Sequence, residues 1–405
     1  MTPLRLAYFS PLPPQRTGIA DYSAALLPYL GELAQVTAFV DDAQCLQAPP
    51  PGVRAMYPLS EFDTRRWQFD LALYQIGNSR FHESIYLHLQ HFPGVVVLHD
   101  FYLHHLIAGM TAWRGDFAGY AREMGYALGP VGVQLARAAR SGQRSYALFE
   151  YPLNERVLDC SLGVIVHSQY AAREVRLKRP PLPVVTVAHL MSLPAPERNV
   201  RERQRVPMDA FIVACAGQVT VEKRIELILR AIARAREHVP GLRFLLVGDV
   251  PEWYPTDLGD LIRQLDLDDV VIRTGHVAEL EQLDAYIAAA DVCVNLRYPT
   301  IGETSGSVLR VMAAGRPVIV SHDGWYAELP DSACIKLKHG ADDELALAQQ
   351  LIDLADDRSR GEAIGRQARA YVERECAPER AAQAYLDFAR QVMAGIRNEE
   401  TRKVR

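Results

Sequence analysis

The stretch FIVACAGQVTVEKRIELILRAIARAREHV, residues 211–239, decides the fold class. It opens with a short apolar run, passes through a small polar loop that starts at Gly217, and continues with the apolar period of a helix. A buried strand that leads into a helix in this way is the repeating unit of a parallel sheet with helical crossovers. The stretch therefore predicts an α/β fold.

The same alternation runs along most of the chain. Residues 101–159 show no clear strand and are predicted to be helical, as is everything after residue 341, including an amphipathic segment at 379–393. The pattern predicts two Rossmann-like, doubly wound domains. Strands are predicted at 4–9, 36–40, 71–74, 95–98, 163–167 and 183–187 in the first half, and at 211–216, 244–247, 270–274, 292–296 and 317–320 in the second.

A polar segment without apolar periodicity, MSLPAPERNVRERQR, is predicted to link the two domains. Ligands of open α/β sheets bind beyond the carboxyl ends of the strands, so two such domains packed face to face would share a central cleft. The predicted organisation is a first domain at 1–190, the linker at 191–205, a second domain at 206–378, and a C-terminal helix and tail at 379–405.

Composition narrows the possible partners. With 405 residues, 23% of them charged, and a formal net charge of -5, the chain lacks the basic excess that nucleic-acid binding favours. Its six cysteines are scattered without a CxxC pair, which indicates reduced thiols and a cytoplasmic protein. No signal peptide or membrane-length apolar run is visible. We expect a soluble protein, with peripheral contact at the inner face of a membrane left open.

The loop after the first predicted strand carries Gly18 just before a helix. It lacks the GxGxxG pattern of a nicotinamide site. A glycine there lets backbone N–H groups approach an anion at the helix N-terminus. The alternative is an ordinary turn, with Asp21 as the helix cap.

Polar residues also follow other strands of the first half. His99 and Asp100 stand at a strand end, where an imidazole can bond a sugar oxygen and a carboxylate can orient it. Asn78, His82 and His104 are candidates for the acceptor or sugar side. Ordinary turn chemistry is the alternative for the loop with Asn78, and helix packing or capping is the favoured interpretation of His104. No metal site is predicted, because His99 and His104 are not spaced as two ligands on one helical face.

In the second half, Gly217 and Gln218 are followed by Lys223 and Arg224 at the predicted start of a helix. Cations there run against the helix dipole, which suggests that they are aimed at a phosphate. The alternative is a solvated charge pair with Glu222.

The segment NLRYPTIGETSGS, residues 295–307, is the densest motif. Small residues at a helix start expose N–H groups that can cradle a diphosphate, hydroxyl groups add donors, an arginine supplies charge, and a glutamate suits sugar or ribose hydroxyls. The candidate donor-binding residues here are Arg297, Glu303, Thr304, Ser305, Gly306 and Ser307.

These motifs, together with MAAGRPV at 312–318, resemble the family 4 retaining glycosyltransferases of the GT-B fold. The resemblance implies that Lys223 binds the donor diphosphate, that Glu303 binds donor hydroxyls, that Gly18 approaches the phosphates and that His99 lies near the transferred sugar. It also implies that the domain at 1–190 is the acceptor side, that the domain at 206–378 binds the nucleotide sugar, and that the helix and tail at 379–405 cross back to the first domain.

Two positions depart from the family pattern: Gln218 stands where an arginine is usual, and Arg310 where a second glutamate is usual. Glu303 matches the first glutamate only if one residue is deleted after it.

The expected function is transfer of a hexose-type sugar from a nucleotide-diphosphate sugar to a glycan, lipid-linked or small-molecule acceptor, with retention of configuration and without a metal or other cofactor. Catalytic roles are expected for His99, Asp100, Lys223 and Glu303. Two alternatives remain: a nucleotide-sugar epimerase-like enzyme, and an inactive nucleotide-sugar binding or scaffold protein.

Overall fold

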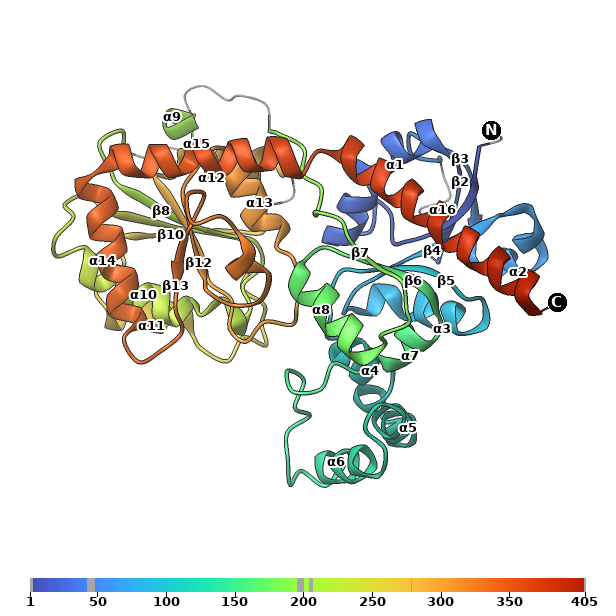
Figure 1. Ribbon diagram of the computed structural model, residues 1–405. Helices are drawn as coiled ribbons and strands as arrows, with labels where there is room; N and C mark the ends of the chain where they lie inside the picture. The colour runs from blue at the N-terminus through green and yellow to red at the C-terminus, as the bar shows by residue number, and fades with distance from the viewer. Residues whose placement is uncertain (1–2, 42–47, 195–199, 204–206, 278, 404–405) are drawn as a thin grey trace. The chain divides into compact units, whose positions relative to one another are not determined.

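The computed structural model describes residues 3–41, 48–194, 200–203, 207–277 and 279–403 (Figure 1). The chain divides into two compact units, the first made of Met1–Leu190, Ile301–Thr304 and Pro378–Arg405 and the second of Met191–Thr300 and Ser305–Ala377. Of the predicted linker at 191–205, residues 195–199 and 204–205 lie outside the described residues, as does Cys45. The five described cysteines are free thiols.

The first unit is built on a parallel sheet in the order β3-β2-β1-β4-β5-β6-β7. Every strand predicted in this half is present. β3 was not predicted because it is an edge strand without a buried residue, so its sequence shows no apolar run. The strands are β1 Arg5–Phe9, β2 Gln35–Val40, β3 Val53–Pro58, β4 Leu71–Ile76, β5 Gly94–Leu98, β6 Ser161–Val166 and β7 Val184–Thr186.

Helices cover both faces of this sheet. Alternate residues of β1 enter two separate cores: Phe9 packs with residues of α3 and α4, whereas Tyr8 packs with residues of α1 and α16. Burial on both faces explains why these strands are continuously apolar. The helices are α1 Gly18–Leu33, α2 Phe62–Arg65, α3 Glu83–His91, α4 His104–Met110, α5 Phe117–Leu128, α6 Pro130–Arg140, α7 Glu155–Asp159, α8 Gln169–Lys178 and α16 Pro378–Lys403.

The second unit has a parallel sheet in the order β10-β9-β8-β11-β12-β13. The strands predicted here are present, and the three-residue β13 at the edge was missed. The elements are β8 Ile212–Ala216, β9 Arg243–Val247, β10 Val271–Gly275, β11 Val292–Asn295, β12 Val318–Ser321, β13 Ile335–Leu337, α9 Val200–Arg203, α10 Ile225–Ala235, α11 Leu258–Gln264, α12 Leu280–Ala289, α13 Gly306–Ala313, α14 Asp343–Asp356 and α15 Arg358–Glu375.

The strand order reverses once in each sheet. In the first unit the reversal lies between β1 and β4, and in the second between β8 and β11. Beyond such a switch point the loops diverge and leave room for a ligand. The loops that follow these four strands carry Gly18, Asn78, Gly217 and Arg297. The predicted doubly wound α/β fold is confirmed, and its topology favours the predicted ligand loops.

The C-terminal helix α16 packs on the first unit, alongside α1. The hydroxyls of Tyr385 and Tyr22 are 2.7 Å apart in the core. Gly163 of β6 lies directly under the helix, since a Cβ there would be 2.8 Å from Val392 and 2.9 Å from Phe388. The glycine therefore allows α16 to pack closely on the sheet.

No helix among the described residues is long and apolar enough to span a membrane.

Replacing Gly163 with alanine should destabilise the first unit, because the added methyl group overlaps Phe388 and Val392. Overpacking of this kind costs about 1–3 kcal/mol in the free energy of unfolding. The matched control is Gly395→Ala in α16, where a Cβ meets open space. That change should add about 0.5–1 kcal/mol of stability. Denaturant unfolding measures both, and equal stabilities would contradict the packing described for α16.

Candidate functional site

A buried ammonium group lies at the carboxyl end of β8. Lys223 ends the 3-10 turn Val221–Lys223, its side chain is 3% exposed, and its Nζ donates to the carbonyl of Ala216 over 2.8 Å. Burial, with a smaller contribution from the neighbouring Arg297, lowers the pKa of Lys223 to about 8. The site thus holds a cation that has lost most of its water and gains from an anionic partner.

Gly217 keeps the space beside this ammonium open. Its φ of +97° belongs to the left-handed region. A Cβ at this position would lie 2.9 Å from Lys223 Nζ and 3.1 Å from Ser307 Oγ. Any side chain here would therefore separate the lysine from the start of α13.

The N-terminus of α13 faces the same space. Ser305 caps the helix, its Oγ accepting from the N–H of Val308 over 3.2 Å. The N–H groups of Gly306 and Ser307 are in the first turn, where a helix provides no carbonyl partner, and the helix dipole adds positive potential. Ammonium, N–H groups and the Ser307 hydroxyl together form an oxyanion site.

Arg297 links the two loops that border this site. Its N–H donates to Ser321 Oγ over 2.9 Å, and its Nη1 lies 3.2 Å from Thr220 Oγ1 and 3.9 Å from a carboxylate oxygen of Glu222. The N–H of Tyr298 donates to the carbonyl of Glu222 over 2.8 Å. These contacts hold Arg297 next to the turn that carries the buried lysine.

The other cation predicted here is directed elsewhere. Arg224 precedes α10, in the left-handed conformation with φ 56°, and its Nη1 bonds Asp343 at 2.5 Å. The expectation that Lys223 and Arg224 begin the helix is wrong, because α10 begins at Ile225 and has Glu226 in its first turn. The dipole preference is therefore obeyed.

The two departures from the family pattern have different surroundings. Gln218 is exposed beside Gly217. Arg310 forms an ion pair with Asp284 of α12 at 2.9 Å, so it joins two helices.

Glu303 and Thr304 belong to the first unit, unlike the rest of the motif that contains them. Glu303 is 8% exposed and accepts from the N–H of Ile301 over 2.8 Å. Gly302, with φ +72°, has no room for a side chain, since a Cβ would lie 2.6 Å from Phe101. These contacts fix the carboxylate within a tight turn.

His99 directly follows β5 in the first unit and is buried. Its Nε2 is 2.7 Å from Oε1 of Gln75, so this nitrogen carries the proton and donates. Burial, followed by the nearby His167, His189 and His82, holds the pKa of His99 well below its usual range. The imidazole is therefore neutral at pH 7.

Gly77 is where three predicted features of this edge meet. A Cβ on Gly77 would lie 2.3 Å from Ile19, 3.0 Å from His82 Nε2 and 3.3 Å from Asp100 Oδ2. The same Asp100 oxygen accepts from the N–H of Asn78 over 2.7 Å. The loop after β4, the start of α1 and the end of β5 thus lie next to one another.

Some candidates of the first unit are engaged within the fold. Asn78 Oδ1 accepts from the N–H of Leu106 over 2.9 Å, so the side chain caps α4. His104 bonds the carbonyl of Tyr151 and the hydroxyl of Tyr120 through its two nitrogens, at 3.0 and 2.8 Å. Gly18, by contrast, faces open space.

Two histidines at this edge were not among the predicted site residues. His167 follows β6 and His189 lies just beyond β7. The centre of the His167 ring is 4.8 Å from that of His99 and 5.3 Å from that of His189, and Tyr22 packs against all three. Their positions just after strands could have identified them, as they did for His99.

Within the described part of the chain, no group of three His, Cys, Asp or Glu residues is arranged to hold a metal ion.

The second unit matches a known family. Residues 210–357 match the family described as Glycosyl transferases group 1. The chain is 35% identical over 140 residues to the D-inositol 3-phosphate glycosyltransferase of Kineococcus radiotolerans, which covers 32% of this chain and 31% of that protein. The enzyme of the same name from Kribbella flavida is 30% identical over 187 residues, 43% of this chain and 42% of that protein. The chain spans less than half the length of these curated relatives.

Solved structures extend the likeness to the whole chain at the level of the fold. Anabaena HepE in complex with UDP and glucose has a TM-score of 0.66 at 17% identity, over 96% of this chain and 100% of that one. Sucrose-phosphate synthase from Thermosynechococcus elongatus has a TM-score of 0.70 at 18% identity, over 97% and 100%. The predicted GT-B fold is confirmed.

The buried histidines should make the first unit sensitive to acid. The pKa of His82 and of His189 is about 4 and that of His167 about 3, each lowered chiefly by burial. Below pH 6.5 the unfolded chain binds protons that the folded chain cannot, so stability is lost as the pH falls from 6.5 toward 4. Each such histidine contributes a slope of roughly 1.4 kcal/mol per pH unit.

Denaturant unfolding at a series of pH values measures this slope. His167→Gln should reduce the slope of the unfolding free energy against pH by the contribution of one proton. His238 is exposed, so His238→Gln is the control for the loss of a histidine. An unchanged slope in His167→Gln would show that this imidazole is not buried in its neutral form.

Proposed function

We propose that the protein is a glycosyltransferase that moves a hexose-type sugar from a nucleotide-diphosphate sugar to an acceptor, with retention of configuration. The observation that carries the proposal is the buried Lys223 ammonium, held beside the N-terminus of α13 by Gly217. A diphosphate would satisfy both the desolvated cation and the N–H groups of the helix start. The match of residues 210–357 to glycosyl transferases group 1 supports it independently.

The same groups would stabilise the leaving diphosphate. Negative charge on that group increases as the bond to the sugar breaks, and fixed donors in a dry site stabilise such charge at little reorganisation cost. Lys223 supplies the formal charge, and Gly306 and Ser307 supply N–H donors. Arg297 adds positive potential from the neighbouring turn. This set performs the role that a metal ion plays in other transferases, so we propose transfer that needs neither a metal nor another cofactor.

Sugar recognition would fall to Glu303 and to the edge of the first unit. A carboxylate fixed in a tight turn is suited to accept hydrogen bonds from donor hydroxyls. His99 is neutral, and with Nε2 donating to Gln75 its Nδ1 is left as an acceptor for a sugar hydroxyl. Asp100 and His82 lie at the same strand ends. The acceptor is a glycan, a lipid-linked or a small molecule, and D-inositol 3-phosphate is one candidate, given the name of the partial relatives.

Two other functions predict different products from the same donor site. An epimerase-like enzyme would convert the nucleotide sugar with no acceptor present. A binding or scaffold protein would bind the nucleotide sugar without turnover. Gln218 favours this alternative, because it stands where the family usually has an arginine.

A panel of nucleotide sugars, each with and without acceptors, separates the three functions. We expect acceptor-dependent consumption of one donor and a product whose anomeric configuration, read by NMR, equals that of the donor. Inverted configuration would contradict retention, conversion without acceptor would favour the epimerase, and binding without turnover would favour the scaffold.

Glu303→Gln should lower turnover by about 10²-fold or more, since one strong hydrogen bond to the sugar is weakened.

Removing the buried charge should strongly weaken donor binding. Lys223→Met is predicted to weaken the nucleotide affinity about 100-fold or more, because a charged hydrogen bond in a desolvated site is worth several kcal/mol. The matched control is Lys336→Met, which removes a partly buried lysine of β13 in the same unit. Calorimetric titration with the nucleoside diphosphate measures both. Unchanged affinity in folded Lys223→Met would overturn the site assignment.

Donor affinity should also fall at alkaline pH. The pKa of Lys223 is about 8 in the free protein, lowered by burial. Above that pH the free protein must first take up a proton to bind the diphosphate, so the dissociation constant should rise about tenfold per pH unit. In Lys223→Arg the guanidinium stays charged, and a weaker but nearly pH-independent affinity is expected. A dissociation constant that is flat to pH 9.5 in the parent chain would show that this lysine does not contact the diphosphate.

A further inference from the structure

We propose that the second unit carries another ligand site, for a small phosphomonoester, at the edge of its sheet opposite Lys223. The site is a cavity of about 370 Å³ at the amino ends of β8, β11 and β12. Drug-sized and metabolite-sized ligands occupy pockets of this order. The inference does not rest on the proposed transferase function, because no residue of the donor site lines this cavity.

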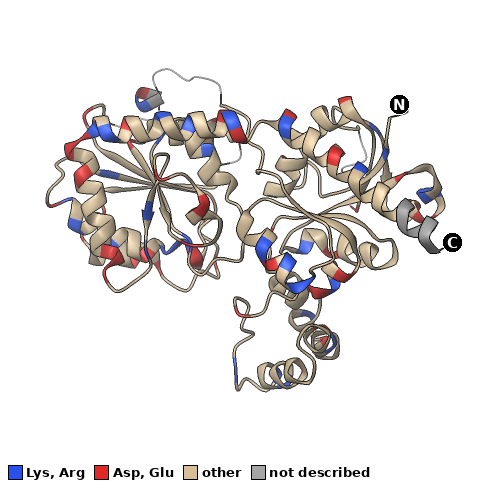
Figure 2. Ribbon diagram, in the orientation of Figure 1, with Lys and Arg blue, Asp and Glu red and all other residues tan. Residues whose placement is uncertain are grey.

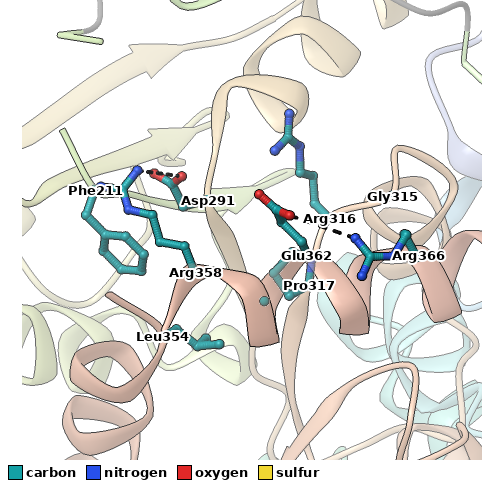
Figure 3. Close-up of a pocket in the computed structure, with 10 residues that line it drawn as sticks. Phe211, Asp291, Gly315, Arg316, Pro317, Leu354, Arg358, Glu362 and Arg366 are labelled. Carbon is teal, nitrogen blue, oxygen red and sulfur yellow. Dashed lines mark hydrogen bonds and ion pairs between the residues drawn. The ribbon is translucent and has the colours of Figure 1, made fainter. Parts of the chain in front are cut away.

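Three arginines from two elements line the cavity (Figure 3). Arg316 comes from the connection between α13 and β12, whereas Arg358 and Arg366 come from the first half of α15. Guanidinium groups have the planar donor geometry that matches phosphate oxygens. Their gathering around one cavity is the first observation that points to an oxyanion.

The carboxylates of the cavity are already satisfied. Asp291 accepts from Arg201 at 2.7 Å and from the N–H of Ile212 at 2.7 Å, and it pairs with Arg358 at 3.4 Å. Glu362 pairs with Arg366 at 3.8 Å. Within the described residues Arg316 forms no ion pair, although its side chain is half-buried. Arg316 is therefore the group whose charge most needs a ligand.

The charge balance favours an anionic ligand. Three lining guanidinium groups (Arg316, Arg358 and Arg366) face two lining carboxylates (Asp291 and Glu362), which leaves one positive charge. A phosphomonoester carries between -1.5 and -2 near pH 7. Elsewhere basic and acidic residues are interspersed along the helices (Figure 2), and the whole chain has a formal charge of -5. The local excess at this cavity thus opposes the balance of the protein.

The cavity also has an apolar floor. Phe211, Pro317 and Leu354 line it and are buried. The Arg358 guanidinium lies 5.6 Å from the centre of the Phe211 ring. A floor of this kind accommodates the carbon skeleton of a ligand, so we infer an organic phosphate in place of the free ion.

Two glycines hold the arginine-bearing elements together. A Cβ on Gly365 of α15 would lie 2.1 Å from the carbonyl oxygen of Gly315, the residue before Arg316. Gly361 lies one turn earlier on α15 and faces Pro317. Close backbone approach fixes the separation between Arg316 and α15, so the cavity is a built feature of the unit.

The test uses the full-length chain carrying Lys223→Met, so that phosphate cannot bind through the donor lysine. Glucose 6-phosphate is titrated by calorimetry, with inorganic phosphate and glucose as the two partial probes. We expect saturable binding of glucose 6-phosphate below roughly 1 mM, weaker binding of inorganic phosphate, and none of glucose. Arg316→Gln should weaken the affinity roughly tenfold to a hundredfold.

Two further variants keep the test decisive. Arg366→Gln changes an exposed side chain, so it should fold normally and still weaken binding severalfold. Arg374→Gln, on the same helix but paired with Glu375 away from the cavity, should not alter the affinity. The proposal would be overturned if no phosphate showed saturable binding, or if glucose bound as tightly as glucose 6-phosphate. It would also be overturned if Arg316→Gln and Arg366→Gln both kept the affinity of the parent chain.

Discussion

The constraint on which this structure depends is that all strands of each sheet are parallel and end at one edge. A parallel sheet requires helical crossovers, and where the strand order reverses, successive crossovers run to opposite faces and leave the carboxyl ends of two strands uncovered. In the second unit those strands are β8 and β11, and the residues that follow them include Lys223 and Arg297. In the first unit they are β1 and β4, followed by Gly18 and Asn78. The candidate chemistry lies where the topology leaves space.

Burial then determines what the polar groups at these edges can do. Lys223 loses its water and keeps one carbonyl partner, so its charge is poised for an anion. His99 and His167 are buried and His189 is half-buried beside them, and the pKa of each is lowered, so none can readily take up a proton. One edge therefore presents fixed positive charge and the other presents neutral hydrogen-bonding rings.

The second unit carries positive charge at both edges of its sheet, in different forms. At the carboxyl edge a buried lysine combines with helix N–H groups, and at the amino edge arginines from α15 and from the loop before β12 surround a cavity. The lysine is buried, whereas Arg358 and Arg366 are exposed. α13 begins beside Lys223 and ends just before Arg316, so a single helix connects the two edges.

Much of the fold and part of the candidate site could be predicted from the sequence. Strands buried on both faces and amphipathic helices have local signatures, so the doubly wound fold and the loops with Lys223 and His99 were predictable. The edge strands β3 and β13 lack that burial signature and were missed. The tertiary structure decided where the side chains point: Arg224 to Asp343, 119 residues away, Asn78 to the start of α4, and His167 to His99. Apolar periodicity is set by near neighbours along the chain, whereas the partner of a polar group depends on which distant elements the fold brings beside it.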